Sequence, residues 1–502
     1  NKIMKKHYRI LAGVLALLML GFSLASCKKK QDDGNSDGSK EGSVTTASGD
    51  ENDPYRDDLP SLDFEGRTVS LLCSGKAAVA DEFFSEGESS NKVSTAVWKR
   101  NQTVKERLGI ELNVILDADG ASDSEAVNKK LDIAINGGDD TYDIVASHTY
   151  IAARYMLRNN YRNLKAMDYV NLEKAYWAEG FNDIFSWGND KQYLATGSAA
   201  ISIYRFLYVT IYNKEMFASF GVTDPYDLVK SGKWTIDEQY RLSKLFVSDD
   251  QSSYGLSTGY QISIDPYWVS FDCGILSKDT ENHFTADTTS TVNKVSPIVD
   301  KLQQIFKDSS TVVTPYEEDG FTNLSKTIVP FYEEKAAMAT CLCYAIETNM
   351  QNLVKLSYGI VPLPKYNEDQ TRYYSGIQDQ VTAFGVSLTV TDDRAGMVGA
   401  TLECIASESY AQVVPEYYGS ALSYKYLQDP QSKEMLQLTY EGSRMAMAAV
   451  YTGSLLKDTG FTTMMRKLIA AEGNTTSSTF RGIKSQLTNG VKTLNSTFGT
   501  MK

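Results

Sequence analysis

Histidine is scarce in this chain of 502 residues, which has three histidines in all. Two of them, His148 and His283, lie beyond the N-terminal region and far apart in sequence. Histidine-based metal sites and serine–histidine–aspartate triads need histidines close to other ligands or to a nucleophile. The sequence also has no GxxxxGK[ST] nucleotide motif and no HExxH zinc motif. We therefore expect neither a catalytic metal nor any other cofactor.

Cysteine is also sparse, with six in the chain. Cys27 belongs to the N-terminal region. The other five are an odd number, mostly flanked by apolar residues: Cys73, Cys273, Cys341, Cys343 and Cys404. Cys341 and Cys343 lie two residues apart in a predicted strand, which gives poor geometry for a disulfide between them. We interpret the five as small buried apolar side chains rather than as disulfides or metal ligands.

Positive charge is in deficit, because 50 lysines and arginines face 63 aspartates and glutamates. The net charge of -13 argues against nucleic acids and anionic lipid surfaces as partners. Long apolar runs are missing after residue 24, so the body of the chain has no candidate membrane span. The hydrophobic content of 42% is that of a globular protein, and the body is long enough for one large or two ordinary domains.

The N-terminus has the pattern of an export signal. Lys5, Lys6 and Arg9 precede an apolar run over 10–24, which is shorter than the ~20 residues of a membrane span. The run ends in Leu-Ala-Ser-Cys, which resembles the lipobox of bacterial lipoproteins. This resemblance implies a signal peptide over 1–26 and a lipid on Cys27. A plain secretory signal with a chance cysteine is the alternative.

Residues 28–60 are mostly polar and acidic, with few apolar side chains. Such a segment cannot bury enough surface to offset its ordering entropy. We expect residues 27–60 to be the lipidated cysteine and a flexible linker.

The body begins with a strand–helix–strand–helix–strand pattern over residues 68–146. This alternation predicts parallel pairing with right-handed crossovers. Ligands of such sheets lie beyond the carboxyl ends of the strands. Ser74 and the run His148, Thr149 and Tyr150 occupy this position. His148 and its neighbours could instead be a plain helix entry, with Ser147 or Thr149 as the cap.

Residues 204–246 predict a buried strand followed by three helices. Gly221 can end the first helix in a left-handed conformation. Asp224 and Pro225 suit the N-cap and first turn of the second. Thr235 and Glu238 form a capping box for the third.

The same stretch, with its Tyr-Asn-Lys, Phe-Gly-Val, Asp-Pro and Trp-Thr-Ile-Asp-Glu phrases, resembles the extracellular solute-binding proteins of ABC importers, in their sugar-binding class. Three later phrases extend the resemblance: Lys-Ala-Ala-Met at 335–338, Tyr-Gly-Ile-Val-Pro-Leu-Pro at 358–364, and the segment 374–390. The resemblance can be followed loosely from about residue 64 to residue 471.

This resemblance implies an α/β, periplasmic-binding-protein-like fold of type II, with two doubly wound lobes around a ligand cleft and several crossings between them. We expect lobe one at 61–200 and 382–409, lobe two at 201–381 and 410–472, and a helical segment at 473–502. The implied protein is a monomer, exported and anchored to the outside of the cell membrane. It is not an enzyme, and it delivers a solute, most often a sugar, to membrane permease subunits.

A sugar ring needs a flat apolar surface for its C–H groups and directional donors and acceptors for its hydroxyls. Tyr344 lies at a position where the resembling proteins often carry an aromatic side chain that stacks on the ligand. By the same resemblance, the segment 374–390 is the second crossing between the lobes. Gln378, Asp379 and Gln380 lie in this segment, where they face the cleft or bond one another. The full candidate set is Ser74, His148, Thr149, Tyr150, Tyr204, Arg205, Trp268, Tyr344, Gln378, Asp379 and Gln380.

Three of these candidates have clear alternatives. Arg205, if buried, needs either an acidic partner or an anionic ligand. Trp268 and Tyr344 could be core aromatics. Two other functions also remain open: a surface glycoside hydrolase, which needs two carboxylates about 5–10 Å apart, and a sensor or structural lipoprotein without transport activity. Solutes other than sugars are open as well.

Overall fold

The computed structural model describes residues 53–76, 79–250, 252–259, 264–313, 324–421, 430–456 and 460–502. The predicted signal peptide, Cys27 and most of the predicted linker lie outside these residues. The chain divides into Asn1–Asp50 and Glu51–Lys502, and all of the described residues belong to the second unit. No helix within the described ranges combines the length and apolar character needed to cross a bilayer.

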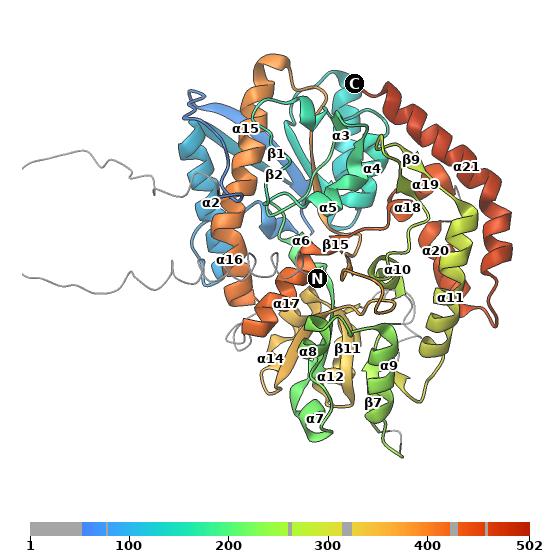
Figure 1. Cartoon of the computed structure of the whole chain (residues 1–502). Coiled ribbons are helices and arrows are strands. Elements are labelled where there is room, and N and C mark those ends of the chain that lie inside the picture. The colour runs from blue at the N-terminus through green and yellow to red at the C-terminus, as the bar shows by residue number, and fades with distance from the viewer. Residues whose placement is uncertain are drawn as a thin grey trace, which may run out of the picture. The chain divides into compact units, whose positions relative to one another are not determined.

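The first sheet has the strand order β14-β3-β1-β2. Strands β3, β1 and β2 are parallel, and β14 joins the edge antiparallel to β3, with Thr382 opposite His148. Helices pack around this sheet, and α2 lies against α15 (Figure 1). The bounds are β1 Arg67–Ser74, α2 Lys92–Leu108, β2 Ile110–Asp117, α3 Ala126–Gly137, β3 Ile144–His148, α4 Thr149–Met156, β14 Thr382–Val386 and α15 Asp392–Glu408.

The second sheet has the order β10-β7-β11-β6-β12. Strand β11 is buried along its whole length, as expected for a central strand with both faces covered. It pairs antiparallel with β6 and parallel with β7. The bounds are β6 Tyr208–Asn213, α7 Lys214–Ser219, α8 Pro225–Lys230, α9 Ile236–Leu245, β7 Tyr254–Ser257, β10 Val312–Val313, α12 Val329–Tyr332, β11 Ala336–Leu342, α13 Cys343–Thr348, α14 Met350–Leu353, β12 Tyr358–Pro362 and α17 Pro430–Glu441.

The predicted crossings connect the two sheets. The first contains a short helix, α6 (Ser202–Arg205), which leads into β6. The second runs beside it, because Leu207 bridges Ile377 and the Gln378 amide donates to the Phe206 carbonyl at 3.0 Å. The two sheets confirm the predicted two-lobed α/β fold.

A third connection follows α15. Residues 409–421 continue as short helical turns that contact α2, and α17 then contacts β12. The expected lobe limits, including the change of lobe at residue 410, stay a prediction.

Local sequence signals fixed several helix ends as expected. The Asp224 carboxylate accepts the Tyr226 amide at 2.8 Å, with Pro225 in the first turn of α8. The Thr235 hydroxyl accepts the Glu238 amide at 3.2 Å at the start of α9. Gly221 has a φ of 62°, so it adopts the left-handed conformation that glycine takes without steric cost.

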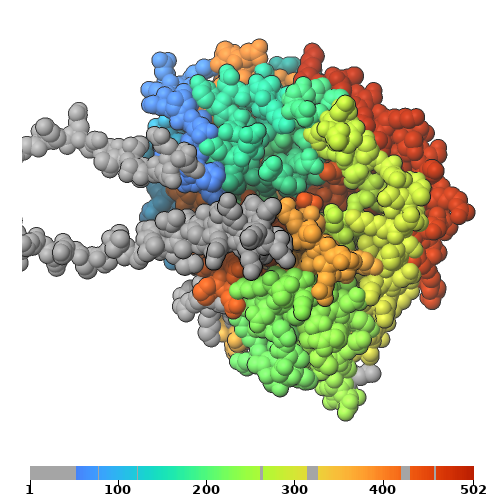
Figure 2. Space-filling model, viewed as in Figure 1, coloured from blue at the N-terminus to red at the C-terminus, as the bar shows by residue number. Residues whose placement is uncertain are grey.

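The C-terminal helix α21 (Thr476–Thr500) lies along α11 (Thr288–Phe306) and α19 (Thr452–Leu455). In Figures 1 and 2 its red surface adjoins the yellow α11 at one margin of the molecule. The Trp187 indole, which follows α5 in the chain, donates to the Asn495 side chain at 2.8 Å. Asn495 also donates to the Phe284 carbonyl at 2.8 Å. Helix α21 is therefore fixed to segments 186–187 and 284–285.

The five described cysteines are all buried and unpaired, which confirms their interpretation as small apolar side chains. The remaining helices and strands, in chain order, are α5 Glu179–Asn182, β4 Ser186–Trp187, β5 Lys191–Gln192, α10 Asp265–Ser270, β8 Ser277–Lys278, β9 Phe284–Thr285, β13 Ser375–Gly376, α16 Val414–Glu416, β15 Ser443–Arg444, α18 Met447–Val450 and α20 Phe461–Ala470. Short 3₁₀ turns, among them η1 (Ala80–Glu82), complete the fold.

Candidate functional site

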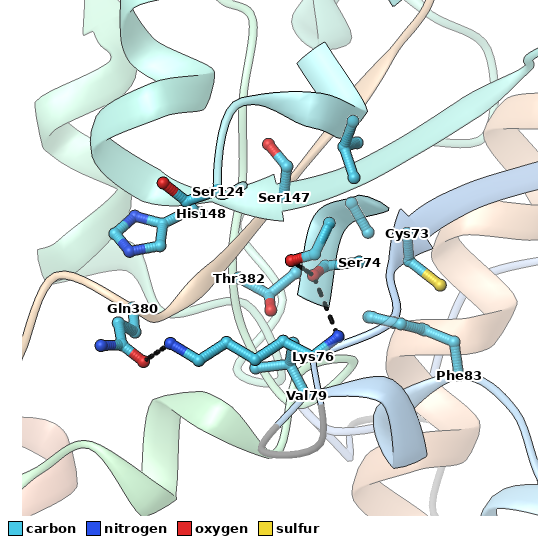
Figure 3. A pocket seen from close by; sticks show the side chains of 13 residues that line it. Cys73, Ser74, Lys76, Val79, Phe83, Ser124, Ser147, His148, Gln380 and Thr382 are labelled. Atoms are coloured by element: carbon cyan, nitrogen blue, oxygen red, sulfur yellow. Dashed lines mark hydrogen bonds between the residues drawn. The ribbon is translucent and has the colours of Figure 1, made fainter. Parts of the chain in front are cut away.

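A hollow lies at the carboxyl ends of β1 and β3, where β14 begins (Figure 3). This is the sheet edge at which the parallel pattern places a ligand. The hollow brings together Ser74, His148 and Gln380, three of the predicted residues. Its other polar lining comes from Lys76, Ser124, Ser147 and Thr382.

Lys76 extends across the hollow toward the second crossing (Figure 3). Its ammonium donates to Gln380 Oε1 at 2.5 Å, and its backbone amide donates to the Ser74 hydroxyl at 3.2 Å. The Ser74 hydroxyl in turn donates to the Gly120 carbonyl at 2.9 Å. The loop after β1 is therefore fixed by polar contacts on both sides of the hollow.

His148 ends β3 and is half-buried. Its Nδ1 atom is buried and has no hydrogen-bond partner among the described residues. Burial lowers the pKa of His148, and the Asp379 carboxylate opposes this shift. A neutral imidazole with one nitrogen that has no partner can donate a hydrogen bond to a ligand hydroxyl or accept one from it, depending on its tautomer.

The polar residues of the second crossing bond one another. Gln378 Nε2 donates to Asp379 Oδ1 at 2.5 Å, and the Gln380 amide donates to Gln378 Oε1 at 2.9 Å. All three side chains are half-buried. The three residues therefore bond one another, and of the three Gln380 lines the hollow.

A half-buried ion pair joins α10 and α20. Arg466 of α20 donates to both oxygens of Asp265 on α10, through Nε at 2.9 Å and through Nη2. Burial raises the pKa of Asp265 to about 6, against the lowering effect of Arg466. Burial also raises the pKa of Tyr150 and of Tyr208, and the charges of Asp379 and Asp265 act on both rings. The charges of the second crossing and of this ion pair therefore both act on Tyr150.

Three of the predicted site residues make contacts inside the protein and do not line the hollow. The Thr149 amide and hydroxyl both donate to the Val381 carbonyl, at 3.0 and 2.7 Å, so this side chain ties α4 to the second crossing. Tyr204 is 2% exposed and stacks on Tyr440, with ring centroids 4.7 Å apart. Trp268 is 1% exposed. These side chains support the site rather than line the hollow.

Tyr344 lies at the interlobe end of the second sheet, in the first turn of α13. Its half-buried ring lies 5.9 Å from that of Phe206, which belongs to the first crossing. Tyr344 does not line the hollow of the first lobe.

Sequence reasoning missed Lys76, Asp81 and Glu82. A lysine two residues after Ser74 and an acidic pair in the following turn were the available signals. Glu82 is completely buried, and its carboxylate accepts bonds from the Ser202 amide and, at 2.7 Å, from the Thr382 hydroxyl. It therefore joins the two crossings. Within the described ranges no group of histidine, cysteine and acidic side chains is arranged to hold a metal.

The family model described as "Bacterial extracellular solute-binding protein" matches residues 105–340. No curated protein matches the chain. The match confirms, for this region, the resemblance found in the sequence.

Solved structures agree on the fold. The chain is similar to apo RafE from Streptococcus pneumoniae, with 12% identity, a TM-score of 0.52 and coverage of 85% of this chain and 98% of that chain. It is also similar to a cyclo/maltodextrin-binding protein complexed with maltotetraose, with 14% identity, a TM-score of 0.50 and coverage of 88% and 100%. At such low identity these matches establish the type II binding-protein fold and nothing further.

Proposed function

We propose that this protein is the solute-binding component of an ABC importer and that its ligand is a carbohydrate. The observation that carries the proposal is the polar hollow at the carboxyl ends of β1 and β3, bordered by Gln380 and Thr382 of the second crossing, in a chain whose residues 105–340 match the solute-binding family. The maltotetraose bound by the similar cyclo/maltodextrin-binding protein supports a sugar as the ligand.

The mechanism follows from two lobes joined by crossings. A ligand shifts the protein from open to closed only by binding the closed form more tightly. The residues that line the hollow, together with Tyr150 of the same lobe, offer one set of contacts, and Tyr344 of the second lobe offers another. Closure around a ligand is the hinge motion known for periplasmic binding proteins. The closed form then delivers its ligand to permease subunits in the membrane.

Anchoring completes the proposal. A lipid on Cys27 would hold the protein at the outer side of the cell membrane, with the segment before residue 53 as a tether, because Asp57 is already buried in the body and paired with Arg107. At 5–6 Å × √n such a tether spans ~30 Å, enough for the globular body to reach a permease beside it.

The hydrolase alternative finds little support in the hollow. No residue that lines it, within the described part of the chain, is an aspartate or glutamate. A Gly-Leu-Ser-Thr-Gly segment at 255–259 has the spacing of a hydrolase nucleophile motif. Its Ser257 is, however, buried within β7 and donates to the Thr327 carbonyl at 2.6 Å. It has no access to a ligand.

The test is a thermal-shift screen of the purified protein against mono- and oligosaccharides, with peptides and polyamines as controls. A ligand that binds only the folded state raises the melting temperature with the logarithm of its excess over Kd. We expect a saturable shift with one sugar class and no consumption of that sugar. A shift with a non-sugar solute alone would keep the binding function and replace the ligand, whereas loss of the sugar over time would favour the hydrolase.

A further inference from the structure

Lys76 is a half-buried cation whose bonded partner is neutral. Its ammonium donates to the Gln380 amide oxygen at 2.5 Å (Figure 3). Burial lowers the pKa of Lys76, and the Asp379 charge, which opposes that shift, forms no direct ion pair with Lys76 in the described structure. A charged group removed from water is costly unless an opposite charge or good hydrogen bonds compensate. An anion bound in the hollow would supply that compensation.

Two other cations near the crossings already have acidic partners. Arg205 contacts Asp81 at 2.7 Å and Glu347 at 3.1 Å. Arg466 is paired with Asp265. The sequence left open whether Arg205 binds an anionic ligand. Because Arg205 is already paired with two carboxylates, Lys76 is the better candidate for that role.

The hydrogen bonds inside the hollow leave donors available. The Ser74 hydroxyl hydrogen is used on the Gly120 carbonyl, and that of Thr382 on the Glu82 carboxylate. The Lys76 ammonium uses one of its three hydrogens on Gln380, and the Nδ1 atom of His148 has no partner among the described residues. The described residues that line the hollow have unused hydrogen-bond donors and include no aspartate or glutamate. Such a lining suits ligand oxygens that carry negative charge.

We propose that the hollow binds an acidic saccharide, whose anionic group pairs with Lys76. This inference rests on the proposed function and names its substrate class. Carboxylate, sulfate and phosphate groups share the required chemistry, namely oxygen atoms that carry negative charge and accept several hydrogen bonds. His148 and Gln380 would orient the hydroxyls next to the anionic group.

The experiment is titration calorimetry on the full chain with four probes: maltotetraose, tetragalacturonate, glucose 6-sulfate and glucose 6-phosphate. We expect one anionic probe to bind at least about tenfold more tightly than maltotetraose, since charge-assisted hydrogen bonds are roughly twice as strong as neutral ones. Its affinity should fall as salt is raised. The probe that binds identifies which oxyanion is preferred.

Variants test whether Lys76 is responsible for the preference for anionic sugars. Lys76→Gln should weaken the anionic probe about tenfold or more, whereas Lys76→Arg, which keeps the charge, should weaken it less. Lys99→Gln is the matched control, because the Lys99 side chain is 54% exposed in a surface pair with Glu88. It should leave the affinity unchanged. Melting temperatures of all variants verify that each is folded.

Two results would overturn the inference. If a neutral saccharide binds as tightly as any anionic one, or if Lys76→Gln weakens neutral and anionic sugars equally, Lys76 is only a hydroxyl donor, and the proposed carbohydrate function stands. If no saccharide of either kind binds while another solute does, the proposed ligand class fails, and the inference fails with it.

Discussion

Arg205 holds Asp81 in a two-point ion pair, with Nη1 to Oδ1 at 2.7 Å and Nη2 to Oδ2 at 3.0 Å. The same guanidinium contacts Glu347, through Nε and Nη2, each at 3.1 Å. Asp81 follows β1 of the first sheet, and Glu347 follows β11 of the second. Arg205 therefore links both lobes from its place in the first crossing.

We predict that Arg205→Met destabilises the protein by about 3 kcal/mol, because it leaves two largely buried carboxylates without their shared partner. Arg205→Lys should destabilise the protein less than Arg205→Met does. It should still be less stable than the wild type, since an ammonium cannot make both two-point contacts. Urea unfolding measures the change. Arg241→Met is the control: Arg241 makes a similar two-point pair with Glu238, but its side chain is 55% exposed, so the cost should stay below about 1 kcal/mol. Equal costs at both positions would contradict the prediction.

Glu82 gives the junction of the crossings a pH dependence. Burial raises its pKa from 4.5 to about 7, against the lowering effect of its bonds to Ser202 and Thr382. Between these two values the folded chain keeps a proton that the unfolded chain has released. Stability from this group is therefore complete below pH 4.5 and is lost as the pH rises through about 7.

Glu82→Gln should remove this dependence, because the amide keeps the shape and the hydrogen bonds of the protonated acid. We expect the variant to gain stability relative to the wild type as the pH rises from about 5 to about 8, by at most about 3 kcal/mol. Melting curves over this range test it, and the difference cancels other titrating groups. Glu82→Ala, which leaves Thr382 and the Ser202 amide without a partner, should be less stable at every pH. A constant difference between wild type and Glu82→Gln would refute the prediction.

Much of the fold could be predicted because its signals are local. The cap at Asp224, the break at Gly221 and the alternation of apolar strands with amphipathic helices each depend on a few neighbouring residues. The strand predicted at the start of 204–246 begins only at Tyr208, because the chain first forms the short helix α6. Propensity alone does not separate a turn of helix from a strand in an apolar run.

The site was harder to predict because it depends on contacts distant in sequence. Ser74, His148 and Gln380 were predicted, since strand ends and crossings can be located from the pattern. Lys76 escaped notice because its importance lies in a contact with Gln380, which is 304 positions away. The partners of Arg205 are 124 and 142 positions away, and no local pattern distinguishes an arginine that binds an anion from one that pairs with such acids.

Tyr344 is the predicted stacking surface of the second lobe. Cys343, its neighbour in the chain, is held by a bond from its amide to the Leu207 carbonyl at 3.0 Å, so the ring lies where β11 meets the first crossing. We predict that Tyr344→Ala raises the Kd for the ligand about tenfold or more, because loss of a central aromatic contact typically costs more than 1 kcal/mol. The measurement is titration calorimetry with the sugar identified by the thermal-shift screen.

Tyr344→Phe is the matched control for that variant. It keeps the ring against which a sugar would stack and removes only the hydroxyl, so it should bind nearly as the wild type does. The ring is half-buried, so both variants should fold, with circular dichroism and melting temperature as the check. A Tyr344→Ala variant that is folded and binds like the wild type would show that the second lobe contacts its ligand elsewhere. The site would then rest on Tyr150 and the residues of the first-lobe hollow, and the aromatic contact of the second lobe would have to be sought at another ring.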